Sequence, residues 1–172
     1  MMNRPSPNEY SPSHAAYISL VPDGNVLDVL RSQIDELAAV AARVPQDRET
    51  FAYGDGKWTV RQVFGHMGDG ERIFAYRALC ISRGETASLP GFDENEYVAN
   101  STSSSRELRD LAEELVLTRR ANVHMFESLD EAAWRQTGSA NGTPVSVNAI
   151  AWVMAGHTRH HLNVLRDRYG VA

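Results

Sequence analysis

Apolar residues recur at three- and four-residue steps in four separate segments of this chain, and this pattern constrains the fold more than any other feature. Such spacing gathers apolar side chains on one face of an α-helix, so each segment predicts an amphipathic helix. The four helices are expected at about residues 25–44, 59–83, 106–129 and 146–169. No segment has a persuasive strand pattern, and the sequence therefore predicts an all-α four-helix bundle.

Residues that favour helix ends support these bounds. Asn25 and Thr59 are predicted N-caps, Gly84 and Gly170 are predicted stops, and the serines at 101–105 are expected to cap the third helix. The run Asn141-Gly142-Thr143-Pro144 predicts a turn before the last helix.

Two segments lie outside the predicted helices. Residues 1–24 hold four of the seven prolines, which disfavour a helix, and we expect an extended N-terminal arm packed on the bundle domain of residues 25–172. Residues 85–103 form a long connection, which we expect to cross over between distant helices.

Composition excludes several classes of function. The 172 residues carry a formal net charge of -5, so no basic excess is present to neutralise the phosphates of a nucleic acid. No apolar run approaches the ~20 residues of a membrane helix. The polar start of the chain lacks the apolar region of a signal peptide. We therefore expect a soluble, cytoplasmic protein, in which Cys80, the only cysteine, is a small core residue.

The last predicted helix carries two histidines on its buried seam. Its apolar positions follow steps of 3, 4, 3, 4 and 3 residues, and His157 and His161 occupy two of them. Residues four apart on a helix have Cβ atoms ~6 Å apart, close enough for two imidazoles to bind one metal ion. The run from His157 to His161 has no glutamate, so it lacks the base of a metalloprotease and does not predict proteolysis.

Two ligands are too few for a catalytic zinc ion, which commonly keeps three protein ligands. The candidates for a third are His14, His66 and His124. His66 lies ~80° from the apolar centre of its helix, a phase consistent with a pocket wall. The glycines near it have two interpretations, close helix packing or room for a ligand. They are Gly65, Gly68 and Gly70.

Several residue runs, taken in their order and spacing, carry a resemblance that covers nearly the whole chain. They are Glu9-Tyr10-Ser11-Pro12, Tyr17 to Pro22, Gly56 to Val63, Gly65-His66-Met67, Glu71 to Leu79, Leu89 to Asp93, Ala155-Gly156-His157 and His160-His161-Leu162. On these runs the chain resembles the DinB family, the DinB/YfiT-like superfamily of metalloenzymes.

The resemblance implies a four-helix bundle, often dimeric, with a divalent metal ion held by three histidines. Carried onto this sequence, these are His66, His157 and His161. It also implies zinc or nickel as the metal, which three imidazoles do not discriminate strongly. Characterised enzymes of the family act mostly as thiol-dependent transferases or isomerases, so a low-molecular-weight thiol is an implied cofactor.

The chain departs from the family pattern at two places. Family members often have a carboxylate and a threonine just before the Glu-Arg pair, whereas this chain reads Gly68-Asp69-Gly70. Asp69 keeps an acid there, and Gly70 leaves extra space. Family members also often have an acid directly after the first histidine of the last helix, where this chain has Thr158.

We therefore expect a divalent-metal-dependent enzyme that acts on a small molecule, either a hydrolase or a thiol transferase. Asp69, Glu71 and Asp93 are candidates to orient ligands or carry protons, although a solvated or capping carboxylate is the simpler interpretation of each. Trp58 and Tyr97 are candidates to line the pocket.

Two other functions fit the same sequence. One is a non-catalytic metal- or small-molecule-binding bundle, and the other is a helical interaction bundle without a metal. We also expect a homodimer, formed through the long amphipathic helices.

Overall fold

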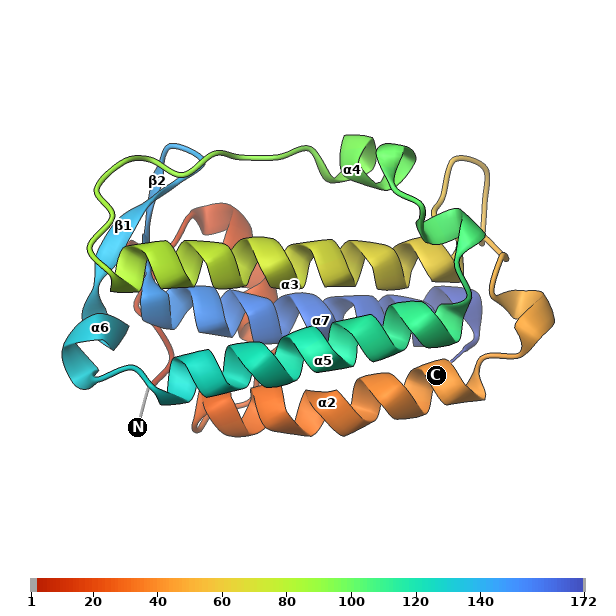
Figure 1. Ribbon diagram of the computed structural model, residues 1–172, viewed down its shortest axis with the longest axis horizontal. Coiled ribbons are helices and arrows are strands. Elements are labelled where there is room, and N and C mark those ends of the chain that lie inside the picture. Colours follow the sequence, from red (N-terminus) through yellow and green to blue (C-terminus); the bar gives the residue numbers. More distant parts are fainter. Residues whose placement is uncertain (1–2, 172) are drawn as a thin grey trace.

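The computed structural model describes residues 3–171 as a bundle of four long helices (Figure 1). These helices are α2 (Val26–Arg43), α3 (Val60–Ser82), α5 (Leu108–Glu127) and α7 (Val147–Tyr169). Each packs against two others, so that their order around the bundle is α2, α5, α3 and α7. The predicted helical bundle is therefore confirmed, with helix bounds close to those expected.

Four helix ends follow the sequence signals. The side chain of Asn25 accepts a hydrogen bond from the first turn of α2, and Thr59 forms a capping box with Gln62 at the start of α3. Ser146 caps α7, and Gly170 ends that helix in the left-handed conformation, with φ 65°.

The start of α5 differs from the prediction. The serine run forms a 3-10 turn, η4 (Ser103–Ser105), and Glu107 is the N-cap residue but makes no side-chain capping bond. The backbone N–H of Leu108 instead donates to Oε2 of Glu49, 3.2 Å away. A carboxylate from the connection between α2 and α3 thus accepts a hydrogen bond from the first turn of α5, where the adjacent residues supply no side-chain cap.

The long helices do not simply alternate in direction. Figure 1 shows α2 and α7 running one way along the bundle and α3 and α5 running the other way. The connection from α3 to α5 therefore returns along the length of the bundle, and it contains α4 (Glu94–Asn100). It joins helices that contact each other, not the distant helices that we expected.

A small sheet interrupts the all-α prediction. After α6 (Glu131–Arg135), strands β1 (Thr137–Ala140) and β2 (Thr143–Ser146) form an antiparallel hairpin, in which Ala140 pairs with Thr143. Asn141 and Gly142 both have positive φ, 52° and 71°, as a tight hairpin turn requires. Strands of four residues are too short to give a clear alternating pattern.

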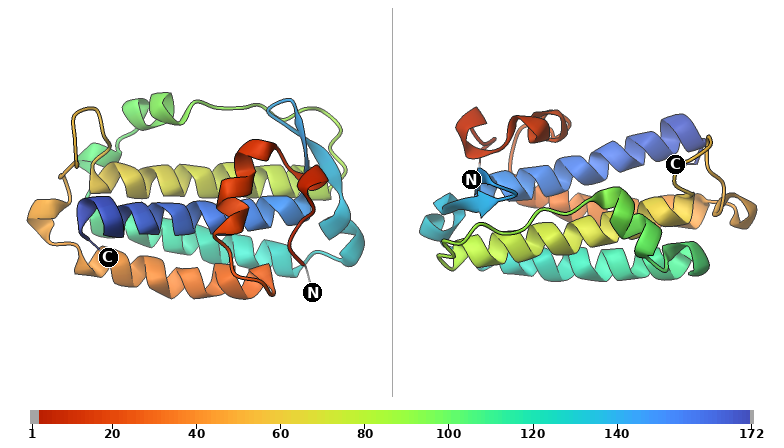
Figure 2. Two further views of the ribbon diagram at one scale, coloured as in Figure 1. Left: turned by 180° about the vertical axis from the view of Figure 1, so that it is seen from behind. Right: turned by 90° about the horizontal axis from the view of Figure 1, so that it is seen from above.

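The N-terminal segment lies against α7 (Figure 2). It is not extended throughout, because it forms two 3-10 turns and a short helix. These are η1 (Pro7–Glu9), η2 (Pro12–His14) and α1 (Ala15–Ser19). Proline at the first position of a helical turn is tolerated, and residues 15–21 contain none.

Close contacts hold this arm in place. The Arg4 guanidinium donates to the carbonyl oxygens of Ile18 and Val21, at 2.6 and 2.7 Å. On α7, Gly156 lies so near Tyr17 that a Cβ on the glycine would overlap the Tyr17 carbonyl group. Glycine at this position lets the backbone of the arm lie directly against the backbone of α7.

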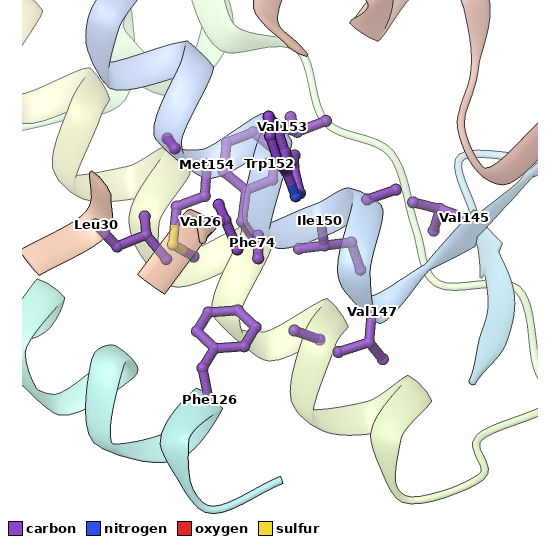
Figure 3. Packing of buried hydrophobic residues seen from close by; sticks show 14 of the residues in the cluster. Val26, Leu30, Phe74, Phe126, Val145, Val147, Ile150, Trp152, Val153 and Met154 are labelled. Atoms are coloured by element: carbon purple, nitrogen blue, oxygen red, sulfur yellow. The ribbon is translucent and has the colours of Figure 1, made fainter. Parts of the chain in front are cut away.

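The buried apolar residues form two clusters along the bundle. Figure 3 shows the hairpin-end cluster, in which Phe74, Phe126 and Trp152 are buried. The second cluster, at the other end, includes Phe64 and Leu165. Buried polar residues separate the two apolar clusters on three of the helices; they include Glu71 of α3, Arg119 of α5 and His157 of α7. The candidate site lies in this polar zone between the clusters. Within residues 3–171, no helix has the length and apolar character needed to cross a membrane.

Candidate metal centre

Three histidine side chains from two helices meet inside the bundle. His66 comes from the middle of α3, and His157 and His161 come from α7. The Nε2 atom of His157 lies 2.9 Å from Nε2 of His66 and 3.1 Å from Nε2 of His161. All three side chains are buried, and one ring nitrogen of each lies within 4.8 Å of the others.

The donor geometry fits a cation better than a hydrogen-bonded cluster. Nε2 of a neutral imidazole has either one N–H or one lone pair, so Nε2 of His157 can form a well-directed hydrogen bond with only one of its two neighbours. Two nitrogens bound to one tetrahedral zinc ion lie about 3.3 Å apart, given Zn–N distances of ~2.0–2.1 Å. The observed spacings of 2.9 and 3.1 Å are close to that value.

Burial keeps these imidazoles neutral. It lowers the pKa of His66 to about 4, an effect that the Glu94 carboxylate opposes and His160 reinforces. Burial also lowers the pKa of His157 and of His161 well below 6.5, and the neighbouring histidines add to this effect. Only a neutral imidazole has a free lone pair for a metal ion, so the cluster is in its ligating form near neutral pH.

Aromatic rings enclose the cluster. The Trp58 ring lies 4.6 Å from that of His66, and the rings of Tyr17 and Phe74 meet the His157 ring edge-on at 5.6 and 5.4 Å. Tyr17 belongs to α1, so the N-terminal arm supplies part of this wall. These rings limit the access of water, and charges in the site therefore interact more strongly.

The glycines of α3 divide between the two roles expected for them. A Cβ on Gly65 would collide with Ser103 of η4, so this glycine permits close packing. A Cβ on Gly70 would lie 3.0 Å from Cε1 of His157, so this glycine leaves room for an imidazole of the cluster. Gly68 meets only the end of the Arg72 side chain, at 3.4 Å.

The three histidines line a cavity of about 430 Å³. Its walls come from the arm, α3, the α3–α5 connection, the hairpin and α7. Besides the histidine cluster, the lining residues that carry polar side chains are Ser11, Ser13, His14, Tyr17, Trp58, Arg77, Glu94, Asn141, Thr143 and His160. A volume of this size suits a small organic molecule.

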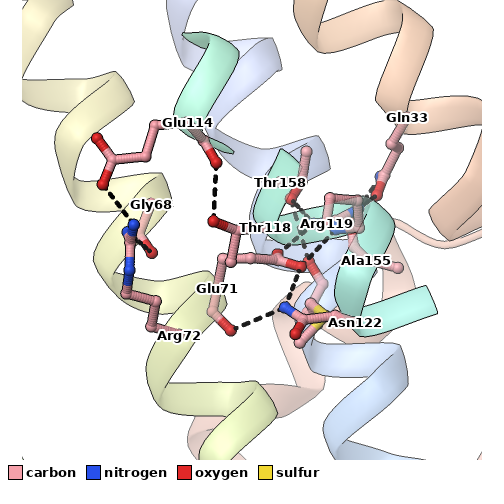
Figure 4. Close-up of polar contacts among 11 residues, drawn as sticks. Gln33, Gly68, Glu71, Arg72, Glu114, Thr118, Arg119, Asn122, Ala155 and Thr158 are labelled. Atoms are coloured by element: carbon pink, nitrogen blue, oxygen red, sulfur yellow. Dashed lines mark hydrogen bonds and ion pairs between the residues drawn. The ribbon is translucent and has the colours of Figure 1, made fainter. Parts of the chain in front are cut away.

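A second group of buried polar side chains joins the four long helices (Figure 4). The Arg119 guanidinium donates to both carboxylate oxygens of Glu71, at 2.7 Å each, and to the side chains of Gln33 and Thr158. Asn122 donates to the same carboxylate. The charges of Arg119 and Glu71 are thus paired, and each has a further hydrogen-bond partner within the bundle.

The carboxylates considered from sequence lie outside the cavity lining. Glu71 pairs with Arg119, Asp93 is the N-cap of α4, and Asp69 lines a smaller cavity of about 90 Å³ beside α5. Tyr97 is half-exposed and packs against Phe92. His124 is exposed on α5, next to Glu127.

Sequence reasoning missed Arg77 and assigned no cavity role to Asn141. The signal for Arg77 was available, because it follows His66 by eleven residues, about three helical turns, and so lies on nearly the same face of α3. His14, considered only as a metal ligand, lines the cavity without joining the histidine cluster.

The fold and the site together define a helical bundle with a buried three-histidine cluster beside a small-molecule cavity. The chain belongs to the DinB superfamily, whose family model matches residues 30–165. A search of curated proteins finds no match.

Two solved structures are similar to the chain. YfiT from Bacillus subtilis, described as a probable metal-dependent hydrolase with an unusual four-helix bundle topology, has a TM-score of 0.74 and 17% identity. The match covers 98% of this chain and 94% of YfiT. A mycothiol-dependent maleylpyruvate isomerase has a TM-score of 0.65 and 16% identity, over 86% of this chain and 60% of that one. At these identities the likeness shows a shared fold.

Proposed function

We propose that His66, His157 and His161 bind one divalent metal ion, zinc or nickel, and that the protein is a metal-dependent enzyme acting on a small molecule. The observation that carries this proposal is the convergence of three buried, neutral Nε2 atoms beside a cavity of about 430 Å³. Three imidazoles supply the ligand set of many catalytic sites.

The ligand count favours an enzyme over a structural metal site. Structural zinc sites are closed by four protein ligands, whereas catalytic sites keep one position open. Among residues 3–171, the group of side chains placed to hold an ion consists of the three histidines alone. This count supports catalysis over the non-catalytic binding protein that is the alternative.

The roles of the surrounding residues follow from their positions. A divalent ion held by the histidines would polarise a substrate carbonyl group and lower the pKa of a coordinated water or thiol. Tyr17, Trp58 and Phe74 would keep bulk water from the cluster. We assign proton transfer to His160 and Glu94, because both are titratable and line the cavity, in place of Asp69, Glu71 and Asp93.

The two similar structures suggest two reactions. One is described as a probable metal-dependent hydrolase, and the other is a mycothiol-dependent isomerase. We therefore propose either hydrolysis by water or group transfer with a low-molecular-weight thiol.

Metal analysis of protein purified without a histidine tag tests the metal site. We expect about one zinc or nickel ion per chain in the wild type and little in His161→Ala. His124→Ala is the matched control, because His124 is an exposed histidine of α5, and it should retain the wild-type metal content. Equal metal content in the wild type and His161→Ala would contradict the proposal.

Turnover assays separate the reactions. Metal-loaded protein is incubated with ester, amide and electrophilic substrates, with and without added thiols. Turnover in water alone identifies a hydrolase, and a requirement for thiol identifies a transferase. Bound metal without turnover in either assay favours the non-catalytic alternative. The homodimer, the cytoplasmic location and the absence of nucleic-acid binding stay predictions.

A further inference from the structure

Arg77 is a buried charge at the cavity, and no carboxylate of residues 3–171 forms an ion pair with it. The residue is 7% exposed. Its hydrogen bond within the chain runs from Nη2 to the carbonyl oxygen of Pro90, at 2.8 Å. A guanidinium group has five N–H donors, so most of the hydrogen-bonding capacity of Arg77 is left for the cavity.

Arg119 is a second buried arginine of the bundle, and its hydrogen bonds provide a comparison for those of Arg77. Arg119 is fully buried, and three of its nitrogens donate to side chains, including both oxygens of Glu71. A buried charge without such a partner is costly. Besides the Pro90 carbonyl, Arg77 has the Phe92 ring, whose centroid lies 5.8 Å from its guanidinium carbon, but it has no anion among residues 3–171. The contrast indicates that an anionic partner of Arg77 comes from outside the chain.

A second unpartnered polar atom lies at the same end of the cavity. Nδ1 of His14 is buried and has no hydrogen-bond partner among residues 3–171. Burial lowers the pKa of His14, and the charge of Arg77 lowers it further, so the two groups are close enough to interact. A neutral imidazole adds no charge beside the guanidinium, so Arg77 is the group that an anion in the cavity would contact.

The one acidic side chain of the cavity lining, Glu94, forms no ion pair with Arg77 in the part of the chain that the structure describes. The pKa of Arg77 is lowered by burial alone, with no compensating carboxylate. The cavity therefore has a cationic end at Arg77, which the lining carboxylate does not neutralise.

The hairpin and the α3–α5 connection hold this cationic end in place. Leu89 pairs with Ala140 of β1, and the Asn141 backbone N–H donates to the Leu89 carbonyl at 2.9 Å. This pairing fixes the position of the Pro90 carbonyl, which in turn orients Arg77. The guanidinium group is thus positioned before any ligand arrives.

We infer that Arg77, beside His14, binds a carboxylate group of the substrate, while the remainder of the substrate extends toward the histidine cluster. This inference rests on the proposed function, because it assigns a substrate class to the same cavity. That class is a small organic acid with its reacting group several bonds from the carboxylate, since the backbone positions of Arg77 and His66 are about three turns of α3 apart.

Calorimetric titration tests the inference with 3-phenylpropanoate and its neutral counterpart 3-phenylpropanamide. We expect full-length wild-type protein, treated with EDTA, to bind the acid about tenfold or more tightly than the amide. Arg77→Met should lose this preference, while Arg120→Met, which removes an exposed arginine of α5, should keep it. Arg77→Gln repeats the test with a neutral polar side chain if Arg77→Met does not fold.

The design separates this inference from the metal proposal. His161→Ala should keep the preference for the acid, because the carboxylate contacts Arg77 and not the ion. A preference that persists in Arg77→Met and Arg77→Gln, or equal binding of acid and amide by the wild type, would overturn the inference. The metal proposal fails on a different result, namely equal metal content in His161→Ala and the wild type.

Discussion

Gly70 of α3 faces the imidazole of His157 on α7, and a Cβ on Gly70 would lie 3.0 Å from Cε1 and 3.4 Å from Nδ1 of that ring. These distances are tighter than ordinary contacts between such atoms. The ring has little freedom to retreat, because Phe74 and Tyr17 pack against it. The absence of a side chain at Gly70 therefore helps to set the position of one nitrogen of the cluster.

Gly70→Ala should lower metal affinity by roughly tenfold, since a displaced ring weakens coordination. Competition with a chelator measures this change, and circular dichroism checks that the helices are retained. Gly68→Ala is the matched control, because its Cβ would meet only the flexible end of Arg72. Equal affinity in both variants would show that Gly70 does not position His157.

The metal-free protein should lose stability as the pH falls from about 6.5 to 4. Burial holds the pKa of His66 at about 4 in the folded protein, whereas a histidine of the unfolded chain has a pKa near 6.5. The unfolded chain thus binds more protons within this window, and the free energy of unfolding decreases by about 3 kcal/mol for this residue. Above pH 6.5 the contribution is fully present.

Urea unfolding of EDTA-treated protein between pH 7.5 and pH 4 measures this dependence. His66→Phe should show a shallower loss than the wild type. The same slope in both proteins would mean that His66 titrates normally in the fold.

Glu71→Gln should lower the free energy of unfolding by about 3–5 kcal/mol, because it leaves the charge of Arg119 buried without its anion. The double variant Glu71→Leu with Arg119→Met should recover much of this loss. Glu131→Gln, which breaks an exposed pair with Arg135, is the control and should change stability little.

Metal content in the folded Glu71→Gln variant tests the role that the sequence suggested for this carboxylate. We expect it to equal that of the wild type, since the partners of Glu71 are Arg119 and Asn122. A marked loss of metal would instead assign Glu71 to the support of the histidines.

Gly156→Ala should destabilise the protein by about 1–3 kcal/mol, because its Cβ would overlap the Tyr17 carbonyl. The arm must move away from α7 to accommodate it. Limited proteolysis should then cut within residues 3–24 faster than in the wild type or in Gly68→Ala. Unchanged cleavage would show that the arm does not need this close approach.

The long helices could be predicted because their signals are local. Asn25, Thr59, Ser146 and Gly170 each act within one turn of a helix end, and the apolar periodicity needs only neighbouring residues. The seam of the last helix placed His157 and His161 together for the same reason. For His66, helical phase left the choice open, and only the family resemblance selected it.

The remaining features depend on contacts between distant residues. Glu49 caps α5 from 59 positions away, and Arg119 meets Glu71 across 48 positions. No local pattern reports such pairs, so Glu71 remained a candidate for the site. The hairpin was missed because its strands are short, although Asn141-Gly142 is a strong turn signal.

The arm, the α3–α5 connection and the hairpin all wall the cavity, yet none of them belongs to the four long helices. Part of the chemical selectivity is therefore encoded in stretches of the gene outside the four-helix scaffold, while Arg77 and the three histidines come from the scaffold itself. Relatives built on this scaffold can diverge in what they accept by exchanging these three segments, and a transplanted set would reshape the cavity of a new host bundle without changing the groups on its long helices.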